Sequence, residues 1–98
     1  MLATAKGTGR ASGPFPVPGD GSTLPGFPGS YRVKAKTVMD SGKLRPRWKT
    51  SDGRILEWDY QHGTVEMYHG RRGNHLGEYD PRTGLMLKGA NASRKVTP

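Results

Sequence analysis

Turn signals recur about every ten residues from Tyr31 onward, and this spacing restricts the possible fold more than any other feature. Each contains Gly, usually beside Asp, Asn or Ser, which favour tight turns. The runs between the signals are short and rich in β-branched and aromatic residues, with no helical stretch of useful length. The pattern predicts a mainly β fold, an antiparallel sheet of five or six strands. The signals are Asp40-Ser41-Gly42, Ser51-Asp52-Gly53, Gln61-His62-Gly63, Gly70 to Asn74 and Asp80-Pro81-Arg82-Thr83-Gly84.

The first thirty residues have a different composition. Residues 1–30 contain seven Gly and five Pro but few large apolar side chains. Such a segment buries too little apolar surface to offset the conformational entropy lost on folding. We predict a linker or N-terminal extension over residues 1–30, with little or no helix, and one folded domain over residues 31–98. Leu24 and Phe27 are predicted to lie on the edge of that domain.

The charge of the chain limits its partners. The 98 residues carry a net charge of +8 and include no cysteine. The lack of cysteine excludes a disulfide-stapled scaffold and thiolate metal centres. No run approaches the roughly 20 apolar residues that span a bilayer, so no stable membrane insertion is expected. A chain this basic favours nucleic acid as partner, with an anionic membrane surface or an acidic protein as alternatives.

Alternation of apolar and polar residues predicts a hairpin over residues 54–69. Its loop is predicted at residues 60–63, with His62 at the tip. Asp59 and Glu66 are expected on the open face, opposite the core. With symmetric pairing, Glu57 faces Glu66, and two opposed carboxylates repel unless a cation lies between them, which suggests Glu66 as a proton acceptor. The predicted core residues of the hairpin are Leu56, Trp58, Val65 and Met67.

This hairpin combines the groups that cleave RNA without a metal. A carboxylate or His can take the 2′-OH proton, His can protonate the 5′ oxygen, and Arg or Lys can stabilise the phosphorane. The same residues also occur on hairpins where they only aid solubility, so the spacing alone leaves both interpretations open. A zinc site formed by His62, His69 and His75 is disfavoured, because their spacing fits no common motif. His69 and His75 are instead predicted to lie on the surface or contact RNA.

Basic side chains flank Trp48, which we expect in the core. Cations with interleaved aromatic residues suit RNA, because they neutralise phosphates while an aromatic ring stacks on an unpaired base. Tyr68, on the predicted open face beside Glu66, is the preferred stacking residue. The predicted phosphate-binding residues of this region are Lys43, Arg45, Arg47, Lys49 and Arg54.

Four ordered segments resemble a known family. They are Arg54 to Tyr68, His75-Leu76-Gly77, Asp80 to Gly84 and Leu87-Lys88-Gly89, and they closely resemble the C-terminal cytotoxic domain of the ribosome-cleaving colicins and cloacin. The similarity covers residues 43–95. It implies a strongly twisted antiparallel sheet. It also implies an endoribonuclease that cuts 16S ribosomal RNA once, at the decoding centre, by metal-independent transesterification without a cofactor.

The resemblance also implies roles for individual residues. The catalytic set of the family corresponds to Asp59, His62, Glu66 and Arg94, and its active-site tyrosine and lysine correspond to Tyr68 and Lys88. Glu66 would deprotonate the 2′-OH and His62 would protonate the 5′ oxygen. Asp59 would orient His62, while Arg94 and Lys88 would stabilise the phosphorane.

The implied partners are the ribosome as substrate and a small acidic immunity protein as inhibitor, the domain being otherwise monomeric. The chain would be the toxic end of a larger toxin, released from one bacterium and active in the cytoplasm of another. Two alternatives remain open. One is a non-catalytic RNA-binding β module, and the other is a toxin nuclease that acts on transfer RNA.

Overall fold

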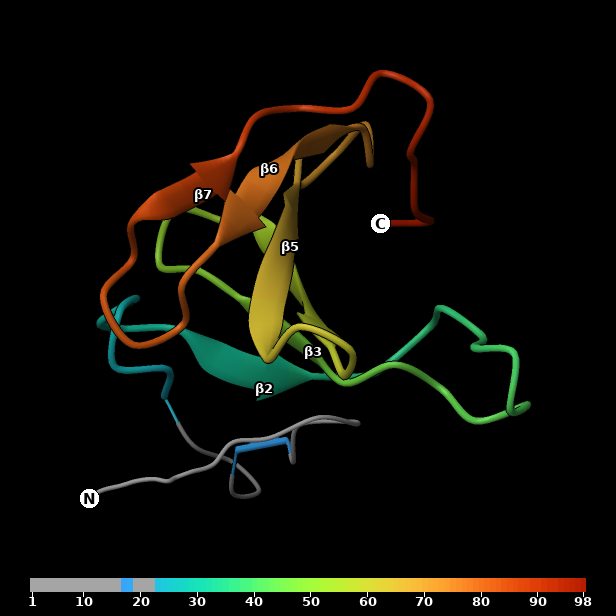
Figure 1. Ribbon diagram of the computed structural model, residues 1–98, viewed down its shortest axis with the longest axis horizontal. Helices are drawn as coiled ribbons and strands as arrows, with labels where there is room; N and C mark the ends of the chain where they lie inside the picture. The colour runs from blue at the N-terminus through green and yellow to red at the C-terminus, as the bar shows by residue number, and fades with distance from the viewer. Residues whose placement is uncertain (1–16, 19–22) are drawn as a thin grey trace.

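A computed structural model describes residues 17–18 and 23–98, and the fold over this range is all-β (Figure 1). Each strand pairs antiparallel with the next along the chain, so the sheet order β2-β3-β4-β5-β6-β7 repeats the chain order. The prediction of five or six antiparallel strands is confirmed. No described residue lies in a helix, so none of the described chain forms a helix that could cross a membrane. The strands are β2 (Tyr31–Val33), β3 (Arg47–Lys49), β4 (Ile55–Asp59), β5 (Thr64–Tyr68), β6 (His75–Tyr79) and β7 (Met86–Lys88).

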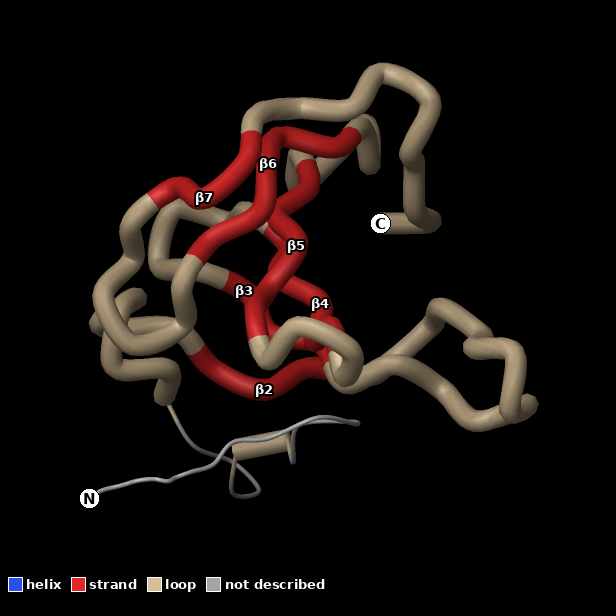
Figure 2. The backbone as a smooth tube through the Cα atoms, in the orientation of Figure 1, coloured by secondary structure: helices blue, strands red, loops and turns tan. Residues whose placement is uncertain are grey.

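The sheet is twisted and open. In Figures 1 and 2, β2 lies across the view while β5 runs nearly upright, so the strand direction rotates from one edge to the other. Such rotation follows from the right-handed twist of each strand. β2 and β7 form the two edges and do not pair with each other, so the sheet does not close into a barrel.

All five predicted signals form turns or bends between strands. The turn before β7 shows how its residue types suit the conformation of the turn. Asp80 Oδ1 accepts a hydrogen bond from the Arg82 amide at 2.8 Å, and the Gly84 amide donates to the Asp80 carbonyl oxygen at 2.8 Å. Gly84 has φ of 79°, a conformation that suits a residue without Cβ. The turn chemistry of the sequence therefore sets where the strands end.

One face of the sheet carries the hydrophobic core. The four core residues predicted for the hairpin all lie in it, and the prediction for Trp48 is also confirmed. The Trp48 and Trp58 rings lie 6.3 Å apart, centroid to centroid. This face therefore anchors β3, β4 and β5 to one another. The buried cluster consists of Leu24, Trp48, Leu56, Trp58, Val65 and Met67.

The segment before β2 is part of this packing. Leu24 is fully buried in the core rather than at its edge, and the Phe27 ring packs against Tyr79 at 5.9 Å. The Gly26 amide donates to the Pro81 carbonyl oxygen at 2.8 Å, an approach too close for a Cβ on residue 26. Most of the predicted linker, residues 1–16 and 19–22, lies outside the described residues. The domain boundary at residue 31 stays a prediction.

The opposite face of the hairpin has the predicted register but not the predicted openness. Glu57 faces Glu66, and Asp59 faces Thr64, as expected. The exposed fraction is nevertheless only 1% for Glu57 and 3% for Glu66, so the prediction of an open face is wrong. Residues distant in the sequence from the hairpin cover these two carboxylates. Thr37 donates to Glu57, and Arg94 near the C-terminus contacts Glu66.

Candidate active site

A cavity of about 420 Å³ lies on this polar face of the sheet. It receives side chains from β4, β5, β6 and β7, from the β4–β5 loop and from the C-terminal segment. It contains all four residues that the sequence predicted as catalytic, together with Lys88. The lining residues are Arg45, Asp59, Gln61, His62, Glu66, His75, Glu78, Lys88, Gly89, Asn91 and Arg94.

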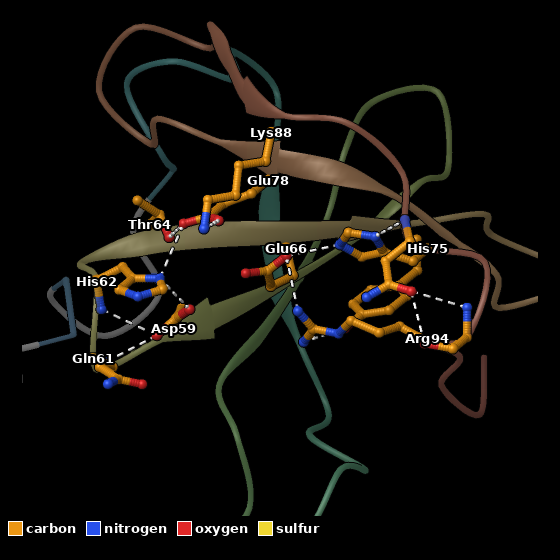
Figure 3. A network of polar contacts seen from close by, with 12 residues as sticks. Asp59, Gln61, His62, Thr64, Glu66, His75, Glu78, Lys88 and Arg94 are labelled. Atoms are coloured by element: carbon orange, nitrogen blue, oxygen red, sulfur yellow. Dashed lines mark hydrogen bonds and ion pairs between the residues drawn. The ribbon is translucent and has the colours of Figure 1, made fainter.

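Asp59 organises one side of the cavity, at the end of β4. Its Oδ1 accepts hydrogen bonds from the backbone amides of Gln61 at 2.9 Å and His62 at 3.1 Å. Its Oδ2 lies 3.1 Å from Nδ1 of the His62 ring. One carboxylate therefore fixes both the loop backbone and the imidazole that the loop carries, as Figure 3 shows. Gly63, with φ of 68°, then returns the chain into β5.

Glu78 on β6 is a second carboxylate beside the same imidazole, and the sequence analysis missed it. Its Oε2 lies 3.2 Å from Nδ1 of His62 and accepts a hydrogen bond from the Thr64 hydroxyl at 2.6 Å. Its Oε1 forms an ion pair with Lys88 Nζ at 4.0 Å. Glu78 is buried, whereas the Lys88 side chain is exposed at the cavity mouth. Glu78 thus joins β5, the hairpin loop and β7.

Glu66 organises the other side of the cavity, in the middle of β5. Its Oε1 lies 2.7 Å from Nε2 of His75 and 3.3 Å from Nη1 of Arg94. In Figure 3 its second oxygen points away from both partners, toward the side where His62 lies. A buried carboxylate needs such partners, because an isolated buried charge is costly. One oxygen of Glu66 is therefore held by the protein and the other faces the cavity.

The prediction that His75 lies on the surface is wrong, while its contact with RNA stays a prediction. The ring is buried, and both nitrogens are engaged within the protein. The Asn91 backbone amide donates to Nδ1 at 2.9 Å, so the proton of the neutral ring lies on Nε2 and is donated to Glu66. The Asn91 contact depends on the C-terminal segment, which the sequence pattern did not place next to β6.

A β-bulge explains why the alternation did not reveal His75 and Glu78. Residues three apart on a regular strand point to opposite faces. Between β5 and β6 the register shifts, because Met67 pairs with Gly77 while Tyr68 pairs with His75. The extra residue lets His75 and Glu78 reach the same cavity. Gly77, with φ of 150°, was the one local sign of a bulge in this strand.

The C-terminal segment brings Arg94 to the cavity. Figure 2 shows this segment leaving β7 and returning past β6, where the His75 amide donates to the Arg94 carbonyl oxygen at 3.2 Å and Asn74 pairs with Lys95. The Arg94 side chain remains partly exposed. Arg94 lies beside Glu66 in the cavity, and its membership of the catalytic set stays a prediction.

Tyr68 is buried, so the prediction that it lies on an open face is wrong. Its hydroxyl accepts a hydrogen bond from Nη2 of Arg94 at 3.0 Å, and the guanidinium carbon lies 6.0 Å from the ring centroid. Burial raises the pKa of Tyr68 above its ordinary value, against the opposing effect of Arg94, so the hydroxyl stays neutral. In this structure Tyr68 supports Arg94, and its use as a stacking surface stays a prediction.

Arg47 is inaccessible to substrate in this structure, contrary to its predicted role in binding phosphate. Its guanidinium forms an ion pair with Glu57 at 2.8 Å, and its side chain is only 2% exposed. Thr37 donates to the same carboxylate oxygen at 2.6 Å. Glu57 and Glu66 therefore each have their own cationic partner, so the predicted repulsion between them is offset.

The other predicted phosphate-binding residues lie in three places. Arg45 lines the cavity and donates to the Trp58 carbonyl oxygen at 2.7 Å, while Lys43 is exposed in the turn before β3. Lys49 and Arg54 line a second hollow of about 540 Å³, which also contains His69. Their contact with RNA stays a prediction.

The residues that could hold a metal ion differ from the predicted competitor. His62 and His75 line the active-site cavity, whereas His69 lines the second hollow, so the three histidines do not converge. Among the described residues, Asp59, His62 and Glu78 form a group whose possible ligand atoms lie within 4.8 Å of one another. His62 is the only nitrogen ligand of that group, and its Nδ1 already faces both carboxylates.

Comparisons with known proteins identify the family of this chain. The model of the Cytotoxic family matches residues 15–97. Colicin E3 of Escherichia coli is 40% identical over 81 residues, which are 82% of this chain and 14% of that protein. Cloacin of Escherichia coli is 45% identical over 65 residues, 64% of this chain and 12% of that protein. The chain thus spans a small part of these relatives. The resemblance noted in the sequence is confirmed, and the chain belongs to the Cytotoxic family.

Proposed function

We propose that this chain is the endoribonuclease domain of a bacterial toxin and cleaves 16S ribosomal RNA at the decoding centre, which halts translation. One observation carries the proposal beyond family membership. A carboxylate and an imidazole, Glu66 and His62, face one cavity, and each is held by separate protein groups. Cleavage by the 2′-OH of RNA requires two such groups, one to take a proton and one to give a proton.

Glu66 is the proposed general base. His75 and Arg94 hold its Oε1, which leaves Oε2 to accept the ribose 2′ proton. The 2′ oxygen then attacks the adjacent phosphorus and forms a phosphorane. These partners keep the carboxylate aligned before the substrate arrives, so little reorganisation is needed during the reaction.

His62 is the proposed general acid. Asp59 and Glu78 contact Nδ1 of its ring, so Nε2 is the nitrogen available to the departing 5′ oxygen. The bond from phosphorus to that oxygen breaks as Nε2 gives up its proton. The products are a 2′,3′-cyclic phosphate and a 5′-hydroxyl. Exchange of protons with water restores the ionised Glu66 and the protonated His62 for the next turnover.

Two cations stabilise the growing negative charge, so the mechanism needs no metal. Arg94 presents a partly exposed guanidinium beside Glu66, and Lys88 extends into the cavity mouth beside Glu78. A guanidinium and an ammonium can both donate to phosphorane oxygens. Tyr68 holds Arg94 in place through its hydroxyl. Arg45, Lys43, Lys49 and Arg54 are proposed to contact phosphates further along the RNA.

The charge of the chain also suits the proposed inhibitor. A net charge of +8 favours fast binding to a small acidic immunity protein. We propose that residues 31–98 form the catalytic domain, against which Leu24 and Phe27 pack, and that residues 1–30 connect it to the rest of a larger toxin. We also propose that the released toxin acts in the cytoplasm of a target bacterium.

The test is to incubate the chain with intact ribosomes and map all new RNA ends. The expected result is one cut in 16S RNA at the decoding centre, with a cyclic phosphate on one fragment. Cleavage should be undiminished when transition metals are chelated at a Mg²⁺ concentration that keeps the ribosomes intact. The Glu66→Gln variant should bind ribosomes as the wild type does but cleave about 10²- to 10⁴-fold more slowly, the usual contribution of a general base.

Other outcomes would contradict the proposal in distinct ways. Ribosome binding by the wild type without any new RNA end would favour a non-catalytic RNA-binding module. New ends in transfer RNA alone would assign a different substrate. A requirement for added transition metal, at a Mg²⁺ concentration that keeps the ribosomes intact, would replace the metal-independent mechanism.

A further inference from the structure

Glu78 has a role that the proposed mechanism does not yet give it. We propose that Glu78 is a positioning residue that, together with Asp59, keeps a proton on Nδ1 of His62 and turns Nε2 toward the RNA. This inference rests on the proposed function, in which His62 protonates the 5′ oxygen. It predicts that all proton transfer by this histidine passes through one nitrogen.

The first step concerns the contacts of the His62 ring. Nδ1 lies 3.1 Å from Oδ2 of Asp59 and 3.2 Å from Oε2 of Glu78. Ionised carboxylates only accept hydrogen bonds, so a nitrogen between two of them is the donor. The hydrogen bond at one ring nitrogen decides where the proton of a neutral imidazole lies. After His62 has given up a proton from Nε2, the remaining proton is therefore on Nδ1.

The second step concerns rigidity. Asp59 lies at the end of β4 and already uses Oδ1 for two loop amides, so it follows any movement of the loop. Glu78 comes from the paired part of β6, opposite Glu66 on β5, and its Oε2 is fixed by the Thr64 hydroxyl at 2.6 Å. A ring held by one acceptor can pivot about that contact. Two acceptors on different strands restrict the pivot, and Figure 3 shows His62 between them.

The third step concerns charge. Glu78 places a buried negative charge in a cavity that must accept an RNA phosphate, and Lys88 offsets part of it. Removing that charge should not weaken RNA binding, because repulsion between Glu78 and phosphate is lost. It should slow the chemical step, because His62 is less well held. The inference therefore predicts a lower kcat without a higher KM, a combination that a general loss of structure would not produce.

The test uses Glu78→Gln in the full chain, a change that keeps the side-chain size and removes the charge. Nitrogen NMR of His62 at alkaline pH should show the proton on Nδ1 in the wild type and a mixture of both tautomers in the variant. With ribosomes as substrate, kcat should fall about tenfold, close to the loss of a hydrogen bond to a charged group, with KM unchanged or lower.

Two further variants make the result specific. Asp40→Asn removes the same charge from an exposed turn outside the cavity and should match the wild type in every measurement. Thr64→Val removes the hydroxyl that fixes Glu78 and should lower kcat in the same direction by a smaller factor. This second variant also tests the inference if Glu78→Gln does not fold.

The outcomes separate this inference from the proposed function. An unchanged tautomer in Glu78→Gln and Thr64→Val, with unchanged kcat, would overturn the role of Glu78 even if ribosomes are cleaved. A wild-type chain that cleaves no ribosomal RNA would overturn the proposed function. The NMR measurement on His62 would still decide whether Glu78 holds the ring.

Discussion

Two histidines line the same cavity, and their surroundings divide the polar face of the sheet into two regions. The His75 side chain is 3% exposed, with both nitrogens bonded to protein groups. The His62 side chain is 46% exposed, and its protein contacts are at Nδ1. We call Arg47, Glu57, Glu66 and His75 the inner polar layer, and His62, Lys88 and Arg94 the rim.

The arginines follow the same division. Arg47 is almost fully buried against Glu57, whereas the Arg94 side chain is 43% exposed although it also contacts a carboxylate. The same residue type, histidine or arginine, therefore has different roles in the inner polar layer and in the rim. A side chain whose hydrogen-bonding groups are all satisfied inside the protein maintains geometry, and one with a group left at the cavity can act on substrate. Glu66 belongs to the inner polar layer yet retains one oxygen toward the cavity.

The largest expected effect follows from His62, in the rim. His62→Ala should lower the ribosome cleavage rate about 10²- to 10⁴-fold, because it removes the proposed general acid. The free energy of unfolding should change by less than about 1 kcal/mol, since a partly exposed loop side chain adds little to stability. Cleavage assays and urea unfolding measure the two effects. A rate within tenfold of the wild type would mean that His62 is not the acid.

In the inner polar layer, Arg47→Ala should reduce the free energy of unfolding by about 3–5 kcal/mol, because it leaves the buried Glu57 carboxylate without its cation. Replacing both residues by apolar side chains of similar size, Arg47→Met with Glu57→Leu, should restore most of that loss. Urea unfolding gives these values. Unchanged stability together with weaker ribosome binding would return Arg47 to the role of a phosphate-binding residue.

A smaller effect is expected for His75→Ala. Glu66 would lose one partner and the Asn91 amide its acceptor, which should cost about 1–3 kcal/mol of unfolding free energy. Hydrogen exchange at the Asn91 amide should become faster, and cleavage should fall because Arg94 is less well placed. His69→Ala, outside the cavity, is the matched control. Full stability in His75→Ala would show that this ring does not hold the C-terminal segment.

The smallest effect is expected outside both regions. Lys49→Ala should weaken ribosome binding only about two- to threefold and should reduce the dependence of affinity on salt by about one counterion at most. Its cleavage rate at saturating ribosome concentration should equal that of the wild type. Binding titrations at several salt concentrations test this. A lower rate at saturation would place the second hollow within the reaction itself.

The sequence was sufficient where the determining contacts are local. The turn residues and the alternation in residues 54–69 predicted the hairpin, its core face and the pairing of Glu57 with Glu66, because these depend on neighbours a few positions away. The loop signal likewise placed His62 at the tip. For these reasons most of the sheet could be predicted before the structure was known.

The sequence did not predict the features that depend on contacts between distant segments. The inner polar layer is buried because Thr37 and the C-terminal residues cover it, and no local pattern reports such a contact. His75 and Glu78 were missed because a bulge overrides the period of two in β6. Leu24 was assigned to the domain edge because its Gly- and Pro-rich surroundings concealed that one side chain fills the core.

The match between sheet order and chain order has a mechanical consequence. Every strand lies next to its neighbours in sequence, so the sheet can be peeled from either edge one strand at a time, without pulling one segment through another. Four of the five connections between paired strands have six residues or fewer, which lowers the entropic cost of re-forming those pairs. A chain with this topology can therefore rebuild its sheet, and with it the cavity, one strand at a time after complete unfolding.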